Sequence, residues 1–173
     1  MKGAKILVTG GVKSGKSDYA LERGARVDGE KIFLATAQAR DEEMKARIEN
    51  HRKERPAEWR TLEEPFKVAD ALNRRKTGVF IIDCLTIWTS NHLEVSDDDV
   101  FQSQSLLLAE AVGNFGGTAI LVTNEVGLGI IPADAASRKY GRWLGSLNRQ
   151  IAAVCDEVVL MVAGQPVFIK RGI

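Results

Sequence analysis

Eight residues near the start of the chain have the pattern of a phosphate-binding loop. They are Gly10, Gly11, Val12, Lys13, Ser14, Gly15, Lys16 and Ser17, and they fit G-x-x-x-x-G-K-[ST]. In such a loop, glycines let the backbone turn its N–H groups inward at a helix N-terminus, where they bind phosphate oxygens. The Lys16 amine would then reach the β- and γ-phosphates of a nucleotide, and the Ser17 hydroxyl would bind Mg²⁺.

The segments on both sides of the loop fit this interpretation. Residues 5–9 form a short apolar run typical of a strand, and residues 17–23 carry acidic side chains in their early turns, as an opening helix does. The alternative is a glycine-rich turn that binds nothing. The order of strand, loop and helix favours phosphate binding.

A second chemical candidate is Asp83. The four residues before it, 79–82, are all apolar and predict a central strand buried on both faces. An acid at the carboxyl end of such a strand, downstream of a phosphate-binding loop, has the position of a Walker B aspartate, which holds Mg²⁺ or its water. The alternative is a helix cap or an exposed strand end.

A highly charged segment, residues 41–54, is the third candidate and is predicted as a helix that ends before Pro56. Met44, Ile48 and His51 would share one helix face because they are spaced four and three apart. Five cations surround His51, namely Lys45, Arg47, Arg52, Lys53 and Arg55.

Two interpretations of this helix remain open. Composition alone favours a solvated helix whose charges serve solubility and whose His51 is half buried at the apolar edge. Alternatively, the cations bind polyphosphate and disfavour the imidazolium form. His51 would then stay neutral near pH 7 and could act as a nucleophile.

The elements around these candidates predict one α/β domain over residues 1–173, with a mostly parallel central sheet, helices on both faces and a C-terminal hairpin around residues 164–166. Residues 85–93 are ambiguous, and we place only Trp88 in the core. Expected strands are 5–9, 31–35, 57–62, 79–83, 118–122, 158–162 and 167–170, of which 57–62 is expected to be short and exposed. Expected helices begin at 17, 41, 65, 96 and 132. In the helix that begins at Ser96, we expect the run of aspartates at 97–99 to cap the helix rather than bind metal.

Composition limits the function classes. The formal net charge of +1 gives no basic field of the kind that nucleic-acid binders use, so we expect no nucleic-acid partner. No apolar run approaches the roughly 20 residues of a transmembrane helix, and no signal peptide precedes the first strand. Cys84 and Cys155 have no metal-binding spacing and are expected to be reduced core thiols, which predicts a cytoplasmic protein.

Six motifs occur in order along the chain, and the ordered set is far more specific than any one of them. They are Val8-Thr9-Gly10-Gly11, Ser14-Gly15-Lys16-Ser17, Ala35-Thr36-x-Gln38, Asp41-x-Glu43-Met44-x-x-Arg47-Ile48-x-x-His51, Arg55-Pro56-Ala57-x-Trp59-Arg60-Thr61 and Val122-Thr123-Asn124-Glu125-Val126-Gly127. With this set the chain resembles the bifunctional adenosylcobinamide kinase/adenosylcobinamide-phosphate guanylyltransferase family of cobalamin biosynthesis, over nearly its whole length.

The resemblance implies a RecA-like P-loop NTPase fold and two successive reactions. ATP or GTP first phosphorylates the aminopropanol hydroxyl of adenosylcobinamide. GTP then guanylylates an enzyme histidine with release of pyrophosphate, and adenosylcobinamide phosphate accepts the GMP. The resemblance also implies a homotrimer.

The family motif places the guanylylated histidine on His51, so His51 and Lys16 are the expected catalytic residues. Ser17 and Asp83 are the expected Mg²⁺ ligands. The resemblance places nucleotide contacts on residues 10–17 and on Ala35, Thr36, Ala37, Arg52, Lys53, Glu54, Arg55, Glu63 and Asp83.

The chain departs from the family pattern in two places. Ala37 stands where the family often has serine, which removes a hydroxyl that could contact nucleotide. The segment from Asp83 to Thr118 is shorter than the pattern, which bears on the oligomer contact or the corrinoid-facing surface. The second histidine, His92, lies outside every motif and is expected to be packed or interfacial.

Two other functions compete with this one. A single-reaction small-molecule kinase would need Lys16, Ser17 and Asp83 but would have no use for His51. A RecA-like ATPase module that acts on nucleic acid or a partner protein would predict a basic surface and usually further domains, which a 173-residue chain of net charge +1 does not favour.

Overall fold

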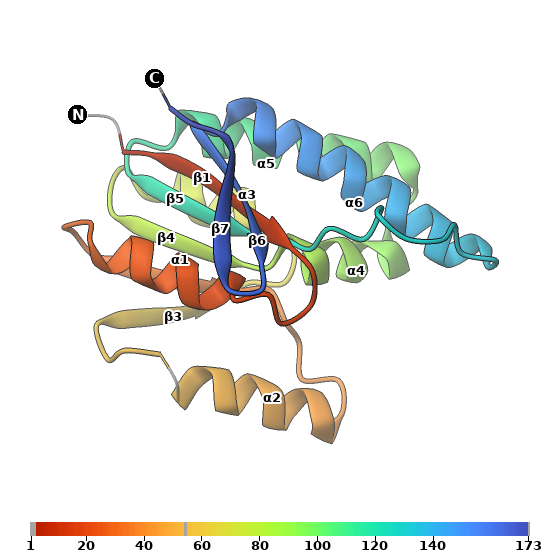
Figure 1. Cartoon of the computed structure of the whole chain (residues 1–173), viewed down its shortest axis with the longest axis horizontal. Helices are drawn as coiled ribbons and strands as arrows, with labels where there is room; N and C mark the ends of the chain where they lie inside the picture. The colour runs from red at the N-terminus through yellow and green to blue at the C-terminus, as the bar shows by residue number, and fades with distance from the viewer. Residues whose placement is uncertain (1–2, 54, 173) are drawn as a thin grey trace.

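The computed structural model describes residues 3–53 and 55–172, and its centre is a seven-stranded sheet with the order β3-β2-β4-β5-β1-β6-β7 (Figure 1). All neighbouring strands are parallel except β6 and β7, which form an antiparallel hairpin. The strands are β1 (Lys5–Gly10), β2 (Lys31–Ala35), β3 (Trp59–Glu63), β4 (Val79–Asp83), β5 (Thr118–Val122), β6 (Glu157–Val162) and β7 (Gln165–Lys170). The helices are α1 (Lys16–Ala25), α2 (Glu42–Lys53), α3 (Val68–Asn73), α4 (Leu85–Val95), α5 (Asp98–Asn114) and α6 (Ala135–Val154).

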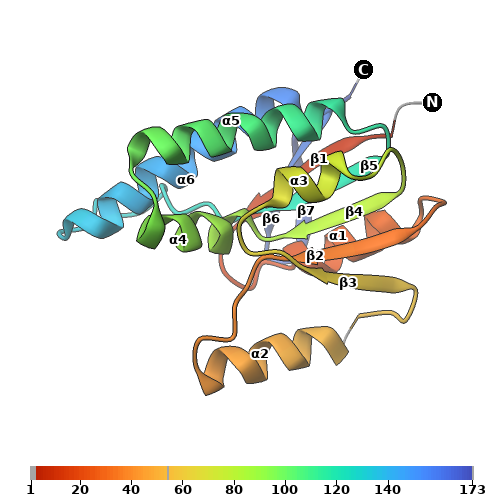
Figure 2. The ribbon, with the colours of Figure 1, turned by 180° about the vertical axis from the view of Figure 1, so that it is seen from behind.

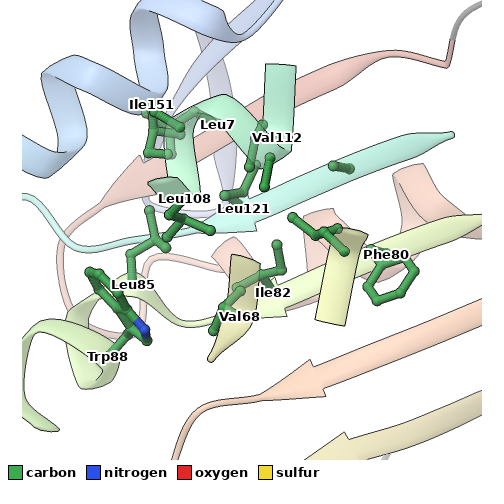
Figure 3. Packing of buried hydrophobic residues seen from close by; sticks show 14 of the residues in the cluster. Leu7, Val68, Phe80, Ile82, Leu85, Trp88, Leu108, Val112, Leu121 and Ile151 are labelled. Carbon is green, nitrogen blue, oxygen red and sulfur yellow. The ribbon is translucent and has the colours of Figure 1, made fainter. Parts of the chain in front are cut away.

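Alternate residues of the central strands enter two separate cores. Leu7, Ile82 and Leu121 face the larger core, where α3, α4, α5 and α6 pack (Figure 3). Their sequence neighbours, such as Ile6 and Ile81, face the second core, which α1 covers. This arrangement explains the continuous apolar runs in the sequence, because a parallel strand covered on both faces has no solvent side.

Helix α2 belongs to neither layer. Figures 1 and 2 show it beyond the β3 edge of the sheet. Its apolar stripe is narrow, and Met44 and Ile48 are only half buried. A helix with so little apolar surface cannot join a core, so its position is set by the loops that hold it.

The strands predicted at 31–35, 79–83 and 118–122 are confirmed with the same bounds. The ambiguous segment is now resolved, because residues 85–93 belong to α4. In α4, Leu85, Thr89, Asn91 and His92 are buried as well as Trp88. The prediction for His92 is confirmed: its ring is 5% exposed and lies against Trp88, Phe66 and Phe101.

Several predicted details of single elements were wrong. Helix α6 begins at Ala135, after its cap Asp134, and not at residue 132. Helix α5 begins at Asp98 rather than at Ser96, and the expected capping by the aspartate run is confirmed, because the Asp97 carboxylate accepts from the Val100 N–H. Helix α3 begins at Val68 and not at residue 65, since Glu64 first accepts from two backbone N–H groups. Two more corrections concern strands: Ala163 and Gly164 alone make the hairpin turn, both with positive φ, and Trp59 of β3 is buried rather than exposed.

Both cysteines are free thiols, and one of them differs from the expectation of a core residue. Cys155 is buried beside the larger core, as predicted. Cys84 is half buried at the N-terminus of α4, where its sulfur accepts from the Ile87 N–H at 3.5 Å. Among the described helices, none is long and apolar enough to cross a membrane.

Candidate active site at the phosphate-binding loop

The phosphate-binding loop connects β1 to α1 at the carboxyl edge of the parallel strands, where α/β proteins bind ligands. Two of its glycines are required by its shape. Gly10 has φ 147°, and a Cβ there would lie 2.5 Å from the Met161 carbonyl oxygen. Gly15 caps α1 with φ 90°. Side-chain-bearing residues rarely adopt these conformations, so the loop needs glycine at both positions.

Lys16 lies over this loop. Its side chain is 9% exposed, and its Nζ donates to the Gly11 carbonyl oxygen at 2.5 Å. Burial lowers the Lys16 pKa from its ordinary value, although the nearby Cys84 and Asp83 side chains oppose this effect. The amine is therefore held at the mouth of the loop, where phosphate oxygens would replace the carbonyl as its partner.

Ser17 and Asp83 meet across the sheet edge. The Ser17 hydroxyl donates to Oδ2 of Asp83 at 2.8 Å. Ser17 follows the loop after β1 and Asp83 ends β4, and β5 lies between these two strands in the sheet. A hydroxyl and a carboxylate in contact are hard oxygen donors of the kind that Mg²⁺ prefers. Within residues 3–53 and 55–172, no cluster of three or more His, Cys, Asp or Glu side chains could hold a metal by itself. Phosphate oxygens and water would have to complete the coordination.

A cavity of about 110 Å³ opens beside this pair, between the loop and α2. Both residues of the α2 apolar stripe, Met44 and Ile48, face into it. Its lining comes from five stretches of the chain and consists of Ser17, Phe33, Ala35, Ala37, Met44, Ile48, Arg55, Asp83, Cys84 and Ile87. We call it the α2 cavity. It combines apolar walls with a few polar groups, as small-ligand sites do.

Arg55 provides the cation of the α2 cavity. Its guanidinium lies 3.6 Å from the centre of the Phe33 ring and donates to the Thr61 hydroxyl at 3.0 Å. Burial lowers the Arg55 pKa, an effect that Asp83 opposes. An arginine guanidinium nevertheless stays charged in proteins. An arginine fixed in this way is suited to bind phosphate or a purine face.

The predicted nucleotide contacts divide into two groups in the structure. Ala35, Ala37, Arg55 and Asp83 line the α2 cavity together with Ser17. The other predicted contacts that the structure describes do not line it. The Thr36 side chain is fully buried and bonds to the backbone of Cys84, and Arg52, Lys53 and Glu63 are exposed.

Two predicted site residues fall on parts of the chain that the structure does not describe. Glu54 lies between the two described ranges. The backbone of His51 belongs to the last turn of α2, but its side chain is outside the described part. The assignment of His51 as the guanylylated residue therefore stays a prediction.

Sequence reasoning missed three lining residues, Phe33, Cys84 and Ile87. Phe33 lies in an apolar strand and has the sequence appearance of a core residue. Ile87 belongs to the stretch at 85–93 that could not be assigned, and Cys84, just before it, was expected to be a core thiol. Only the position of Cys84, directly after a Walker B aspartate, could have indicated the site.

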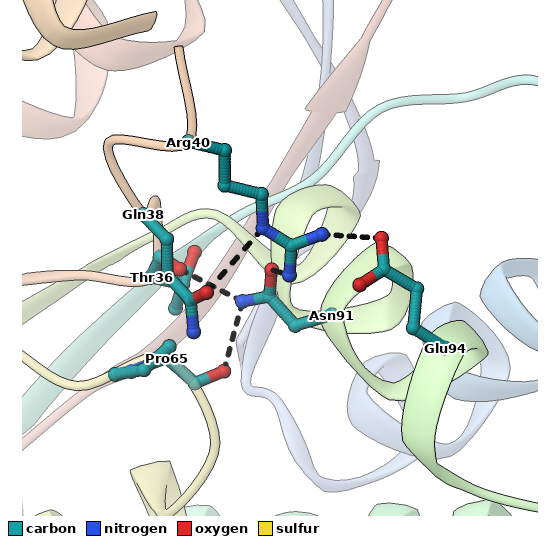
Figure 4. Close-up of polar contacts among 6 residues, drawn as sticks. All are labelled: Thr36, Gln38, Arg40, Pro65, Asn91 and Glu94. Carbon is teal, nitrogen blue, oxygen red and sulfur yellow. Dashed lines mark hydrogen bonds and ion pairs between the residues drawn. The ribbon is translucent and has the colours of Figure 1, made fainter.

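Asn91 holds the segment between β2 and α2 in place (Figure 4). Its side chain is 3% exposed, and its Nδ2 donates to the carbonyl oxygens of Thr36 at 2.9 Å and Pro65 at 3.0 Å. Its Oδ1 accepts from Arg40, which also forms an ion pair with Glu94. Helix α4 is thereby joined to the loop that leads into α2.

Three features define a P-loop nucleotide-binding protein: the strand–loop–helix with Lys16 held over the loop, the aspartate at the end of β4 and the mostly parallel sheet. A family model described as cobinamide kinase / cobinamide phosphate guanyltransferase matches residues 6–169. The chain belongs to this family of enzymes.

Curated relatives match over nearly their whole lengths. The bifunctional adenosylcobalamin biosynthesis protein CobP of Pseudomonas aeruginosa is 42% identical over 167 residues, which cover 95% of this chain and 96% of the relative. The CobU proteins of Escherichia coli and Salmonella typhimurium are 36% and 35% identical to this chain. Each alignment covers 95% of this chain and 99% of the relative.

Solved structures support the RecA-like fold alone. A prototypical ATPase from the type III secretion system of pathogenic bacteria aligns with a TM-score of 0.57 at 14% identity, over 92% of this chain and 51% of that chain. The flagellar accessory protein FlaH from Methanocaldococcus jannaschii aligns with a TM-score of 0.52 at 13% identity, over 99% of this chain and 80% of that chain.

Proposed function

We propose that this chain phosphorylates adenosylcobinamide with ATP or GTP and then transfers GMP from GTP to the product, giving adenosylcobinamide-GDP. The observation that carries the proposal is the α2 cavity. It joins the phosphate-binding loop, the Ser17–Asp83 pair and the helix that bears His51, in a chain that belongs to the family.

In the first reaction, the aminopropanol hydroxyl oxygen of adenosylcobinamide attacks the γ-phosphorus. The bond from that phosphorus to the bridging oxygen breaks, the nucleoside diphosphate leaves with the electron pair, and the hydroxyl proton goes to solvent. Such transfers need positioning and charge stabilisation rather than a protein nucleophile. Lys16 and the loop N–H groups provide both.

In the second reaction, a neutral imidazole nitrogen of His51 attacks the α-phosphorus of GTP and pyrophosphate leaves. A phosphate oxygen of adenosylcobinamide phosphate then attacks the same phosphorus, and the P–N bond breaks to restore the imidazole. Burial of His92 supports the choice of His51, since the chain has two histidines and the His92 ring is enclosed by Phe66, Trp88 and Phe101.

Ser17 and Asp83 would hold Mg²⁺, which neutralises phosphate charge when it is bound. Replacing Asp83 with asparagine keeps the shape of the side chain and removes its charge. Mutations of residues next to metal ligands lower metal affinity by roughly 10–100-fold. We therefore expect the Mg²⁺ concentration for half-maximal activity to rise by at least this factor, and high Mg²⁺ to restore part of the activity. Asp99→Asn, an exposed change on α5, is the matched control. If the activity of Asp83→Asn does not depend on Mg²⁺ concentration, Asp83 does not act through the metal.

The function itself is tested by incubating the protein with adenosylcobinamide, GTP and Mg²⁺ and determining the masses of ligand and protein. We expect adenosylcobinamide phosphate, then adenosylcobinamide-GDP, and a protein species heavier by one GMP. A phosphorylated corrinoid without a GDP derivative or protein adduct would instead identify a single-reaction kinase.

We further propose that residues 1–173 act as one nucleotide-binding domain of a homotrimer in the cytoplasm. Family resemblance supports the trimer, and the two free thiols are compatible with a reducing compartment. Sedimentation equilibrium of the purified chain would measure the number of subunits.

A further inference from the structure

We infer that a second cavity on the other side of the phosphate-binding loop holds the base and ribose of the nucleotide that donates the γ-phosphoryl group. This inference rests on the proposed function and adds a nucleoside site to it. Among the described residues, none of the nucleotide contacts predicted outside the loop lines this second cavity. The guanosine of guanylyl transfer would then lie on the other side of the loop, next to α2.

The second cavity has a volume of about 450 Å³ and lies between α1 and the β6–β7 hairpin. This volume is in the range of small-ligand sites and can accommodate a nucleoside. Its lining consists of Gly15, Asp18, Tyr19, Glu22, Arg23, Arg26, Met161, Gly164, Pro166 and Phe168. We call it the hairpin cavity.

The hairpin cavity is continuous with the phosphate site. Gly15 belongs to both, and Asp18 and Tyr19 follow directly on the first turn of α1. The hairpin is attached to the loop, because the Gly164 N–H donates to the Ser14 carbonyl oxygen at 3.1 Å. A nucleotide whose phosphates lie in the loop can therefore extend its ribose and base along α1 and under the hairpin.

The walls of the hairpin cavity suit a purine nucleoside. Tyr19, Pro166 and Phe168 offer apolar surfaces for the base, and aromatic rings stack on bases with little regard to identity. Asp18 and Glu22 lie one helical turn apart and present carboxylate oxygens to ribose hydroxyls or to the amino groups of either purine. Such a site would accept both ATP and GTP.

Arg23 contributes an independent observation. Two of its hydrogen bonds go to Glu157 at 2.9 Å, but its Nε–H is buried and has no partner within the described residues. A buried donor without a partner costs free energy unless a ligand or water satisfies it. Because Arg23 lines the cavity, a bound nucleoside or its ordered water can accept this hydrogen bond.

The chemistry of the two reactions also favours two nucleoside positions. The kinase step breaks the bond at the γ-phosphorus, whereas guanylyl transfer breaks the bond at the α-phosphorus. The α-phosphorus must approach the histidine on α2, and a base next to α2 brings it to that side. In the kinase step no group on α2 reacts, so the base is free to lie in the hairpin cavity while the γ-phosphate stays near Lys16.

The first test uses a probe that does not depend on the corrinoid. The whole protein is photolabelled with 8-azido-ATP and Mg²⁺ and digested with trypsin. We expect the label on the peptides of residues 17–23 and 150–170, which carry Tyr19 and Phe168. A label confined to the peptide of residues 32–40, which lines the α2 cavity, would overturn the inference whether or not the protein acts on adenosylcobinamide.

The second test fills the cavity with Pro166→Trp and uses Val167→Trp as its control. Pro166 lines the cavity, and the next residue along β7, Val167, is exposed and does not line it. We expect Pro166→Trp to raise the KM for ATP and for GTP in the kinase step by about tenfold or more, without a similar loss of protein labelling by α-labelled GTP. Equal effects of the two variants, or equal loss of both activities in Pro166→Trp, would overturn the inference.

Discussion

Lys16→Ala is expected to abolish most of the activity in both reactions. Each reaction develops negative charge on phosphoryl oxygens, and the Lys16 amine is already held at the mouth of the loop that binds them. The loss of one such preorganised donor costs about 3–4 kcal/mol, or roughly a factor of 10²–10³ in kcat. The measurement is kcat for adenosylcobinamide phosphorylation and, separately, the rate of protein labelling by α-labelled GTP.

A suitable control for this variant is Lys76→Ala. Lys76 is an exposed lysine in the turn before β4, at the amino ends of the parallel strands, whereas the site lies at their carboxyl ends. We expect Lys76→Ala to retain the wild-type rates and both variants to unfold at similar urea concentrations. Near-normal turnover by a folded Lys16→Ala protein would contradict the assignment of the phosphate-binding loop.

His51→Ala is expected to separate the two activities. The kinase step needs no protein nucleophile, so the variant should accumulate adenosylcobinamide phosphate at a rate close to that of the wild type. The GDP derivative and the covalent adduct should both be absent, because the attacking nitrogen has been removed. Equal loss of both activities in a folded variant would instead indicate that His51 positions the nucleotide.

The adduct in the wild-type protein should have the chemistry of a phosphoramidate. α-Labelled GTP should label the protein, whereas γ-labelled GTP should not, because pyrophosphate carries the γ-phosphorus away. Acid should release the label, since protonated imidazole is a good leaving group, and alkali should leave it in place. His92→Gln offers a comparison that retains labelling, since the His92 ring is buried and cannot reach a nucleotide. A labelled peptide without His51 would contradict the assignment.

The sequence was sufficient to predict the elements whose signals are local. The glycines of the phosphate-binding loop specify backbone angles at their own positions, and Gly10 and Gly15 do have the positive φ values that exclude most other residues. Continuous apolar runs identify strands buried on both faces, which is why β2, β4 and β5 were predicted with the correct bounds. Because parallel strands end at one edge, the sequence also indicated that Asp83 lies near the loop.

Local patterns could not identify the helix α4. Its buried face contains Thr89, Asn91 and His92 beside Leu85 and Trp88, so the usual alternation of apolar and polar residues is absent. These polar side chains have specific partners, such as the carbonyl oxygens of Thr36 and Pro65 that bind Asn91. Thr36 lies 55 residues and Pro65 lies 26 residues from Asn91 in the sequence, so no periodicity within the helix reveals these partners.

Only the tertiary structure decided where the cavities lie. Phe33 belongs to the second core, as its apolar strand predicts, and it also lines the α2 cavity, where the Arg55 guanidinium packs on its ring. Tyr19 and Phe168 are separated by most of the chain, and they meet in the hairpin cavity because β6 pairs with β1 and brings the hairpin against α1. A motif encodes the conformation of its own backbone, whereas a cavity is the space that distant segments leave when they pack. For this chain the sequence therefore determined the phosphate site, and the packing of α2 and the hairpin determined the shapes on either side of it.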